Sequence, residues 1–337
     1  MTTTSRARRL RLVAVSAVVV LALTVAGSLL IGARSVSPTI VWQALTAFDP
    51  TVADHVVIVT QRIPRTAIGL IAGAALALAG TLMQGLTRNP LADPGLLGIN
   101  AGASVAVLVA ITFFGISQPS GFVWFAFVGA AVAAVVVAVI GTRGPDGDNP
   151  AKLALTGAAV TAGLIAITTF MLTTSAATLD VYRYWQVGGL TTRGLDTVAV
   201  AALPVAVGAV LALSSGRGLD LLSLGSDTAA GLGQNVARTR GLGILAAVLL
   251  CGGATALAGP IVFVGLLVPH LLRALVGVGH GPLLALSIPV GASLLLAADV
   301  IGRVIALPGE VQAGIVVAFV GAPALIALVL RGRRVAL

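Results

Sequence analysis

The chain has 337 residues, of which 58% are hydrophobic and 9% are charged, and its mean hydropathy is +1.09. This number of polar residues is too small to cover the surface of a soluble globular protein of this size. The composition therefore excludes a soluble protein and predicts a polytopic membrane protein. The formal net charge of +9 does not indicate nucleic-acid binding, because only 4% of the residues are aromatic and strand-binding grooves interleave aromatic with basic side chains.

Ten apolar windows predict membrane-spanning helices, since about 20 apolar residues cross the bilayer core as a helix. Four arginines precede the first window, as in a signal peptide, but its apolar run of about 20 residues exceeds the usual ~7–15 and favours a retained helix. We therefore predict an all-α fold in a single transmembrane domain, residues 1–337. The windows, of which the eighth is short, cover residues 12–32, 64–84, 96–114, 122–141, 152–172, 196–213, 240–258, 261–276, 282–301 and 312–330.

The basic residues predict the orientation of these helices. With the N-terminus in the cytoplasm, most of the 20 Lys and Arg residues fall on the cytoplasmic side, as the positive-inside rule requires. We therefore expect a basic cytoplasmic N-terminus at residues 1–11, a cytoplasmic loop at 214–240 and a cytoplasmic C-terminus.

The second window predicts a central helix with a sharp turn at its end. Gly69 and Gly73 lie four residues apart, on one helical face, where missing side chains let another helix approach closely. Proline lacks a backbone donor and restricts the residue before it, so the Pro90 and Pro94 region, residues 88–95, is expected to turn the chain back.

Residues 62–104 contain the pattern R-[LI]-P-R, a Gly/Ala-rich helix and then Q-x-x-x-[RE]-N-P-L-A-[DE]-P-x-x-L-G. With these motifs the segment resembles the FecCD-like or BtuC-like permeases of ABC importers for iron siderophores and cobalamin. Residues 184–190, 259–273 and 308–314 match further family patterns, although Gln312 replaces a usual proline. The resemblance implies a type II ABC importer permease fold in a bacterial cell membrane. It also implies four partners: a second permease, two ATPase subunits and an extracytoplasmic substrate-binding protein.

An internal echo is consistent with that fold. Residues 73–80 recur at 252–259 with an offset of 179 residues, and five predicted helices separate the two copies. The second copy is therefore expected to cross the membrane in the opposite sense, as in transporters built from inverted repeats. The alternative is that Ala/Gly/Leu-rich helices resemble one another by composition alone.

The chain lacks an energy source of its own. The only lysine, Lys152, does not lie in a phosphate-binding loop, so ATP and Mg are expected in the partner ATPase and no cofactor in this chain. The predicted helices hold almost no acids, which argues against an ion-coupled secondary transporter, the main alternative function. Cys251 and three scattered histidines predict neither a disulfide nor a metal site, and we assign no catalytic residue.

Residues 214–240 predict two short amphipathic helices with breaks at Gly225 and Gly233. The pattern L-G-x-D-x-A-x-x-L-G is similar to the loop through which this family contacts its ATPase. The alternative is a helix that lies on the membrane surface, but the loop is poor in basic and aromatic residues. The resemblance assigns the ATPase contact to Leu224, Gly225, Asp227, Ala229, Leu232 and Gly233.

Arg62, Arg65 and Arg303 are expected at the outer face. Any one of them is explained by snorkelling toward the headgroups, whereas three together can pair with carboxylates on a soluble protein. In the family, R-x-x-R and A-D-[IV]-x-x-R supply arginines that receive acidic residues of the binding protein. We therefore assign Arg62, Arg65 and Arg303 to docking of that protein.

The translocation pathway is assigned to the interface between two permeases, with Thr156, Gly157 and Thr161 of the fifth window as lining. Small and hydroxylated residues suit a bulky ligand that passes without tight binding, but the same residues also suit helix packing. By analogy with the family, the cargo is a ferric siderophore, with cobalamin or haem as alternatives. A membrane scaffold without transport is the third function class.

Overall fold

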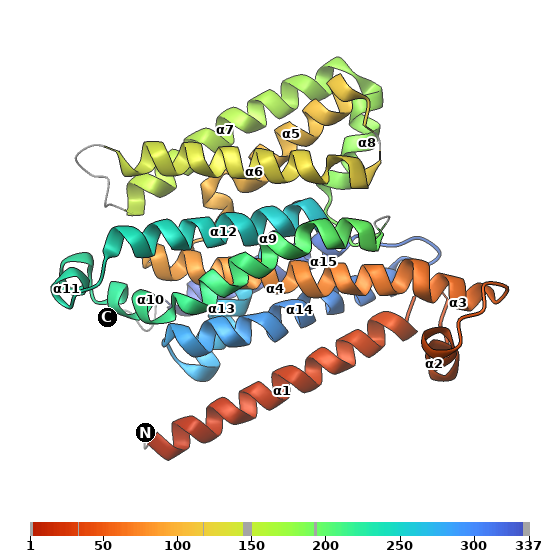
Figure 1. Cartoon of the computed structure of the whole chain (residues 1–337), viewed down its shortest axis with the longest axis horizontal. Helices are drawn as coiled ribbons and strands as arrows, with labels where there is room; N and C mark the ends of the chain where they lie inside the picture. The colour runs from red at the N-terminus through yellow and green to blue at the C-terminus, as the bar shows by residue number, and fades with distance from the viewer. Residues whose placement is uncertain (1–2, 33, 117, 144–149, 192–193, 333–337) are drawn as a thin grey trace.

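The computed structural model describes residues 3–32, 34–116, 118–143, 150–191 and 194–332, and the described part is all-helical (Figure 1). The α-helices are α1 (Thr3–Leu30), α2 (Pro38–Thr46), α3 (Ala53–Val57), α4 (Ile63–Thr87), α5 (Ile99–Phe114), α6 (Pro119–Thr142), α7 (Pro150–Thr174), α8 (Ala176–Gln186), α9 (Leu195–Ser214), α10 (Gly216–Ser223), α11 (Ser226–Gly231), α12 (Val236–Ala258), α13 (Val264–Val276), α14 (His280–Ile305) and α15 (Ala313–Gly332). A π-helical turn, η1 (Ile58–Arg62), and a 3-10 turn, η2 (Pro94–Leu97), precede α4 and α5.

Each of the ten apolar windows falls on one of these helices. In the described part of the chain, seven helices are long and apolar enough to cross a membrane. The remaining windows fall on shorter apolar helices, Ile99–Phe114, Val264–Val276 and Ala313–Ala327. The prediction of an all-helical membrane fold is confirmed, and the count of ten full spans is approximate.

Helix α4 is the centre of the bundle, as its glycines predict. It packs against α14, α12, α13 and α9, and 78% of its most apolar stretch is buried. A Cβ atom on Gly73 would lie 2.5 Å from the Gly291 carbonyl oxygen of α14, and one on Gly80 would lie 2.0 Å from that of Gly265 in α13. At Gly73 and Gly80 the helix backbones meet with no side chain between them, so the predicted close approach is confirmed at Gly73, whereas Gly69 meets the Leu296 side chain of α14.

Helices α4 and α12 run in opposite directions through the bundle, as the inverted echo predicts (Figure 1). The two copies differ at their ends. Helix α12 ends at Ala258, where Gly259 has a φ of 76°, whereas α4 continues past Gly80 to Thr87. The similarity between the two copies is therefore limited to residues 73–80 and 252–259, and the chain after these segments folds differently in the two copies.

The predicted turn after α4 is confirmed. Arg88 ends the helix with a φ of 51°, in the left-handed region that few non-glycine residues adopt. The Asp93 carboxylate accepts a hydrogen bond from Gly95 N at 2.7 Å and caps η2. The chain then returns into the bundle, where Gly157 of α7 packs directly on the Leu96 carbonyl.

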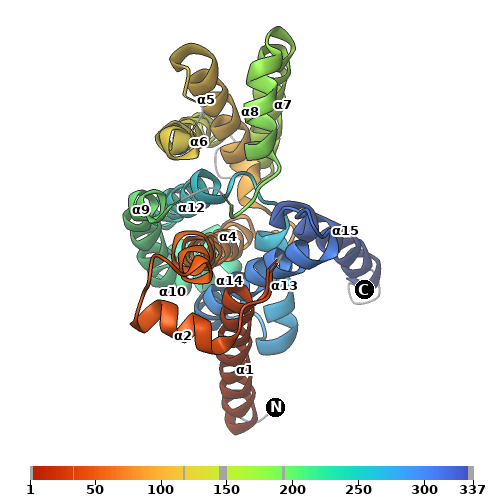
Figure 2. The same cartoon turned by 90° about the vertical axis from the view of Figure 1, so that its right-hand side faces the viewer.

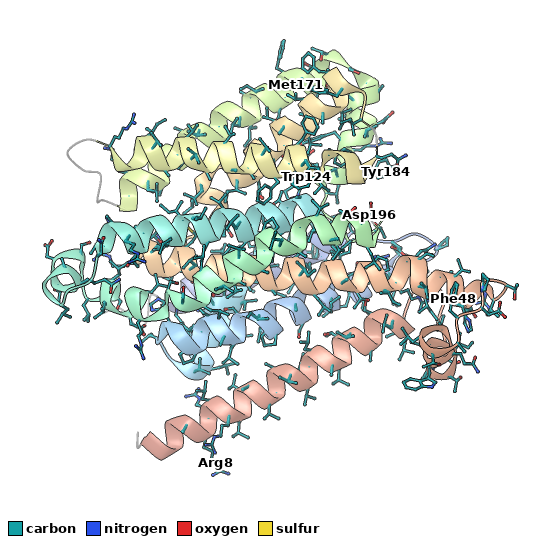
Figure 3. The ribbon with its side chains drawn as sticks, in the orientation of Figure 1. Arg8, Phe48, Trp124, Met171, Tyr184 and Asp196 are labelled. Atoms are coloured by element: carbon teal, nitrogen blue, oxygen red, sulfur yellow. The ribbon has the colours of Figure 1, made fainter. Side chains whose placement is uncertain are left out.

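The two ends of the bundle carry different elements. We name them the α3 end, with α2 and α3, and the α11 end, with α10, α11 and the start of α1 (Figure 1). Phe48, Tyr184 and Asp196 lie toward the α3 end, and Arg8 lies at the α11 end (Figure 3). Seen along the bundle, α5 to α8 form a group on one side of α12, while α13, α14 and α1 lie on the other (Figure 2).

Candidate functional sites at the two ends of the bundle

A buried charge cluster lies at the α3 end, between α4 and α14. Arg65 of α4 donates hydrogen bonds to Asp299 of α14 from Nε at 3.0 Å and from Nη2 at 2.8 Å. One helical turn further along α14, Arg303 donates to the same carboxylate from Nε at 3.0 Å and also from Nη2. Asp299 is fully buried, so its charge is balanced by two guanidinium groups in a region shielded from water.

The cluster extends to α1 and to the segment after α14. Arg65 Nη1 donates to Glu310 Oε2 at 2.7 Å, and the Glu310 side chain is 32% exposed. Arg303 Nη1 donates to the carbonyl oxygens of Ser28 at 2.7 Å and Ile31 at 3.0 Å, at the end of α1. Arginine is suited to this arrangement because its planar group carries five donors.

Arg62 also donates hydrogen bonds to backbone carbonyls at and after the end of α1. Its Nη1 donates to the Leu29 carbonyl at 2.6 Å, and its Nη2 donates to the Arg34 carbonyl. The last carbonyls of a helix have no partner within the helix and carry partial negative charge, so a guanidinium group there stabilises the helix end.

The structure brings the three predicted docking arginines to one end of the bundle but buries their side chains. The exposed fractions are 6% for Arg62, 8% for Arg65 and 2% for Arg303, where the sequence led us to expect exposed groups. Arg65 and Arg303 are buried because both donate hydrogen bonds to the buried carboxylate of Asp299. The Asp299–Arg303 spacing of four residues on one helix was a signal for this pair, whereas nothing in the sequence indicated the role of Glu310.

The segment between α9 and α12 forms a small helical module at the α11 end. The two predicted amphipathic helices are α10 and α11, and the predicted breaks are confirmed at Gly225, with a φ of 108°, and at Gly233, with a φ of 84°. Leu219 and Leu222 of α10 are buried against the body of the protein. A hydrogen bond also joins the module to α12, from Arg240 Nη2 to Ser226 Oγ at 3.1 Å.

The six predicted ATPase-contact residues fall into two groups. Leu224 is 60% exposed and Leu232 is 59% exposed, and Asp227 and Gly233 are also exposed. Gly225 is half-buried, and Ala229 is fully buried, so Ala229 holds α11 to the body of the protein. The described chain thus leaves two large apolar side chains, Leu224 and Leu232, exposed on one short module.

The three predicted pathway residues lie on α7. Thr156 is half-buried and its hydroxyl donates to the Lys152 carbonyl at 2.8 Å. A Cβ on Gly157 would lie 1.6 Å from the Leu96 carbonyl, and Thr161 lies beside Gly98. Gly157 and Thr161 therefore pack α7 against η2, which is the packing alternative considered from the sequence.

A further acidic residue, Asp93, lies outside the predicted helices, in the turn after α4. Asp93 is half-buried, and burial raises the pKa of its carboxyl group, while the hydrogen bond from Gly95 N opposes the rise. Among the described residues there is no group of three or more His, Cys, Asp or Glu side chains that could hold a metal ion.

Comparisons with known proteins show which family this architecture belongs to. Residues 19–331 match the FecCD transport family. The chain is 47% identical over 307 residues to the ferric enterobactin transport system permease protein FepD of Escherichia coli (strain K12), covering 91% of each protein. It is 36% identical over 341 residues to the cobalamin import system permease protein BtuC of Halobacterium salinarum, covering 97% of this chain and 90% of the relative.

A solved structure agrees with these relatives. It is described as a metal-chelate type ABC transporter in an inward-facing conformation, and it matches with a TM-score of 0.82 and 29% sequence identity over 94% of this chain and 98% of the solved chain. The relatives are transport permeases, not enzymes. The chain therefore belongs to the FecCD transport family, as a multi-pass membrane permease of the ABC importer type.

Proposed function

We propose that this chain is the permease subunit of a bacterial ABC importer that carries a ferric siderophore into the cytoplasm. The observation that carries the proposal is the 47% identity to the ferric enterobactin permease along 91% of both proteins. Cobalamin and haem are the alternative cargoes, and a relative named for cobalamin import keeps the first of these open.

We place the α11 end in the cytoplasm, together with both termini, in the inner membrane. The excess of basic residues on that side supports this orientation. One permease domain would comprise the whole chain, residues 1–337, and pair with a second permease, either another copy or a close homologue.

Two ATPase subunits would bind ATP and Mg and contact the α10–α11 module. The exposed Leu224, Asp227, Leu232 and Gly233 supply the contact, and the buried Ala229 with the break at Gly225 keeps the module in position. Closure of the ATPase subunits on ATP would push the module, and the motion would pass through α10 to α4 and α14, against which it packs.

The substrate-binding protein would dock at the α3 end, above Arg62, Arg65 and Arg303. Because these side chains are buried, the accessible member of the cluster is the Arg65–Glu310 pair, in which Glu310 is 32% exposed. An acidic side chain of the binding protein can compete with Glu310 for Arg65, so docking would exchange one carboxylate for another.

The pathway would run along the interface between two permeases, beside α7. Helix α7 has only 11% of its most apolar stretch buried, which leaves one of its faces for a partner subunit. Thr156, Gly157 and Thr161 would then border the pathway by fixing α7 against η2.

Reconstitution in proteoliposomes tests the proposal. Uptake of a ferric siderophore should require the ATPase subunit, internal ATP and the loaded binding protein, and an empty-liposome control corrects for leakage. Uptake that follows an ion gradient without the ATPase subunit would establish the secondary transporter instead. Parallel trials with cobalamin and haem decide the cargo.

A further inference from the structure

A pocket of about 420 Å³ lies at the α11 end, where the last turn of α4 meets α10, α13 and the start of α14. Its lining carries three basic side chains, Arg88, Arg273 and His280, and one acidic side chain, Asp220. The pocket is not part of the docking, coupling or pathway residues assigned above. None of those assignments explains why basic side chains gather in this pocket.

Asp220 is engaged with His280 and does not neutralise the arginines. The Asp220 Oδ1 atom accepts a hydrogen bond from His280 N at 2.9 Å and lies 2.8 Å from His280 Nδ1. This contact ties α10 to the start of α14. Within the described chain, neither Arg88 nor Arg273 forms an ion pair with a carboxylate.

Arg273 is held in place by a neutral partner. Gln84 is 3% exposed, and its Nε2 donates to the Gly265 carbonyl at 3.1 Å, which turns its Oε1 toward the pocket. Arg273 Nη2 donates to that oxygen. A half-buried guanidinium group with an amide oxygen as its recorded partner keeps its positive charge available for an anion.

Arg88 lies between the pocket and the module that we assign to the ATPase contact. It adopts the left-handed conformation at the end of α4, which for a non-glycine residue is unfavourable and is found more often at functional positions. Its Nη1 lies 4.0 Å from the place that a Cβ on Gly225 would occupy, at the break between α10 and α11. The basic pocket is thus continuous with the α10–α11 module.

We propose that this pocket receives a carboxylate side chain of the ATPase subunit, bound between Arg88 and Arg273. Guanidinium groups bind carboxylates with paired, directional hydrogen bonds, and two such groups without a carboxylate partner among the described residues favour an acidic ligand. The contact would join the end of α4 to the ATPase directly, in addition to the leucines of the module. This inference rests on the proposed function, because it needs an ATPase partner.

The chain offers a direct test, because Lys152 is its only lysine. Arg88→Lys places an amine at the pocket, and a carbodiimide then joins that amine to any carboxylate in contact with it. In the assembled complex with the cognate ATPase subunit, we expect a cross-link from position 88 to one Asp or Glu of the ATPase, identified by peptide mass spectrometry. The wild-type complex and Arg11→Lys, an exposed arginine on α1, should not give this cross-link.

Affinity measurements provide the second readout. Arg88→Gln should weaken ATPase binding about tenfold, since it removes one partner of an interfacial charge pair. Changing the cross-linked ATPase acid to its amide should weaken binding by the same factor, and combining both changes should add little.

The outcomes are separable. If the ATPase binds the wild type and Arg88→Gln equally well and position 88 gives no cross-link, this inference is wrong and the proposed function stands. If the ATPase does not bind the wild type at all, the proposed function itself is wrong. If Arg88→Gln changes only the retention of phosphatidylglycerol in purified protein, the pocket binds a lipid headgroup and the ATPase assignment is overturned.

Discussion

Arg65 of α4 and Asp299 of α14, 234 residues apart in the sequence, form a buried ion pair with 2.8 Å between Nη2 and Oδ1. Arg303 shares the same carboxylate. Two guanidinium groups therefore share one buried carboxylate at the junction of α1, α4 and α14, and Arg65 has a second, partly exposed partner in Glu310.

Replacement of Asp299 by asparagine should strongly destabilise the permease. Asp299→Asn leaves two buried guanidinium groups without their shared counter-charge, which should cost about 3 kcal/mol or more of folding stability. Thermal unfolding of the purified protein in detergent measures the effect. Asp180→Asn, at a pair whose side chains are exposed, is the matched control and should stay within about 0.5 kcal/mol. Equal losses from both changes would contradict a structural role of the cluster.

Replacement of Glu310 by glutamine should act on docking rather than on stability. Glu310→Gln weakens a half-exposed pair, so stability should fall by about 1 kcal/mol or less. Because the competing carboxylate is gone, the substrate-binding protein should bind more tightly, by a few-fold, in a surface-immobilised titration. Arg65→Gln should weaken the same binding. Weaker binding to Glu310→Gln would show that Glu310 itself contacts the binding protein.

Enlargement of Gly80 should separate α4 from α13. A methyl group there meets the Gly265 carbonyl at 2.0 Å, and overpacking of this kind costs about 1–3 kcal/mol. The melting temperature of Gly80→Ala should fall accordingly. Gly163 of α7 has no heavy atom within 4 Å of the place for a Cβ, so Gly163→Ala should be neutral or slightly stabilising. A neutral Gly80→Ala would mean that the two backbones are farther apart.

The exposed and buried residues of the α10–α11 module should respond to mutation in different ways. Leu232→Ser changes an exposed side chain and should leave thermal stability unchanged while it lowers ATP-driven uptake. Ala229→Leu inserts bulk at a fully buried position and should lower stability by about 1–3 kcal/mol. Uptake assays and thermal unfolding on the same preparations separate these effects. Normal transport by Leu232→Ser would remove this leucine from the ATPase contact.

Asp93 should make stability depend on pH. A carboxyl group whose pKa is higher in the folded than in the unfolded protein favours folding in its protonated form, so stability falls as pH rises from the unfolded toward the folded pKa and stays lower above it. Asp93→Asn retains an acceptor for Gly95 N and has no charge to bury. Its melting temperature should therefore vary less across that range than that of the wild type. Identical pH profiles would show that the Asp93 carboxylate is well solvated.

The sequence predicted what depends on local pattern. The apolar windows fall on helices because bilayer-length apolar runs have few alternatives to a helix, and Gly225 and Gly233 mark real breaks because positive φ angles favour glycine. It did not predict the burial of Arg62, Arg65 and Arg303. Their partners come from distant segments, including backbone carbonyls of α1 that have no side-chain signature.

The pathway residues show a second limit of the sequence. Gly157 and Thr161 were compatible with both a pathway and a packing role, since small residues serve either. What decides between the two roles is the segment that packs on their face of α7. The turn after α4 brings Leu96 and Gly98 there, and this depends on how the turn folds.

The glycine contacts of α4 also constrain how this permease can move. Where Gly73 meets Gly291 and Gly80 meets Gly265, the backbones touch without a deformable layer of side chains between them. Sliding there would require the backbones themselves to separate, so α4, α13 and α14 are expected to travel as one rigid body. The opening and closing of a transport cycle would then require other helices, such as the group α5 to α8, to move relative to this rigid body.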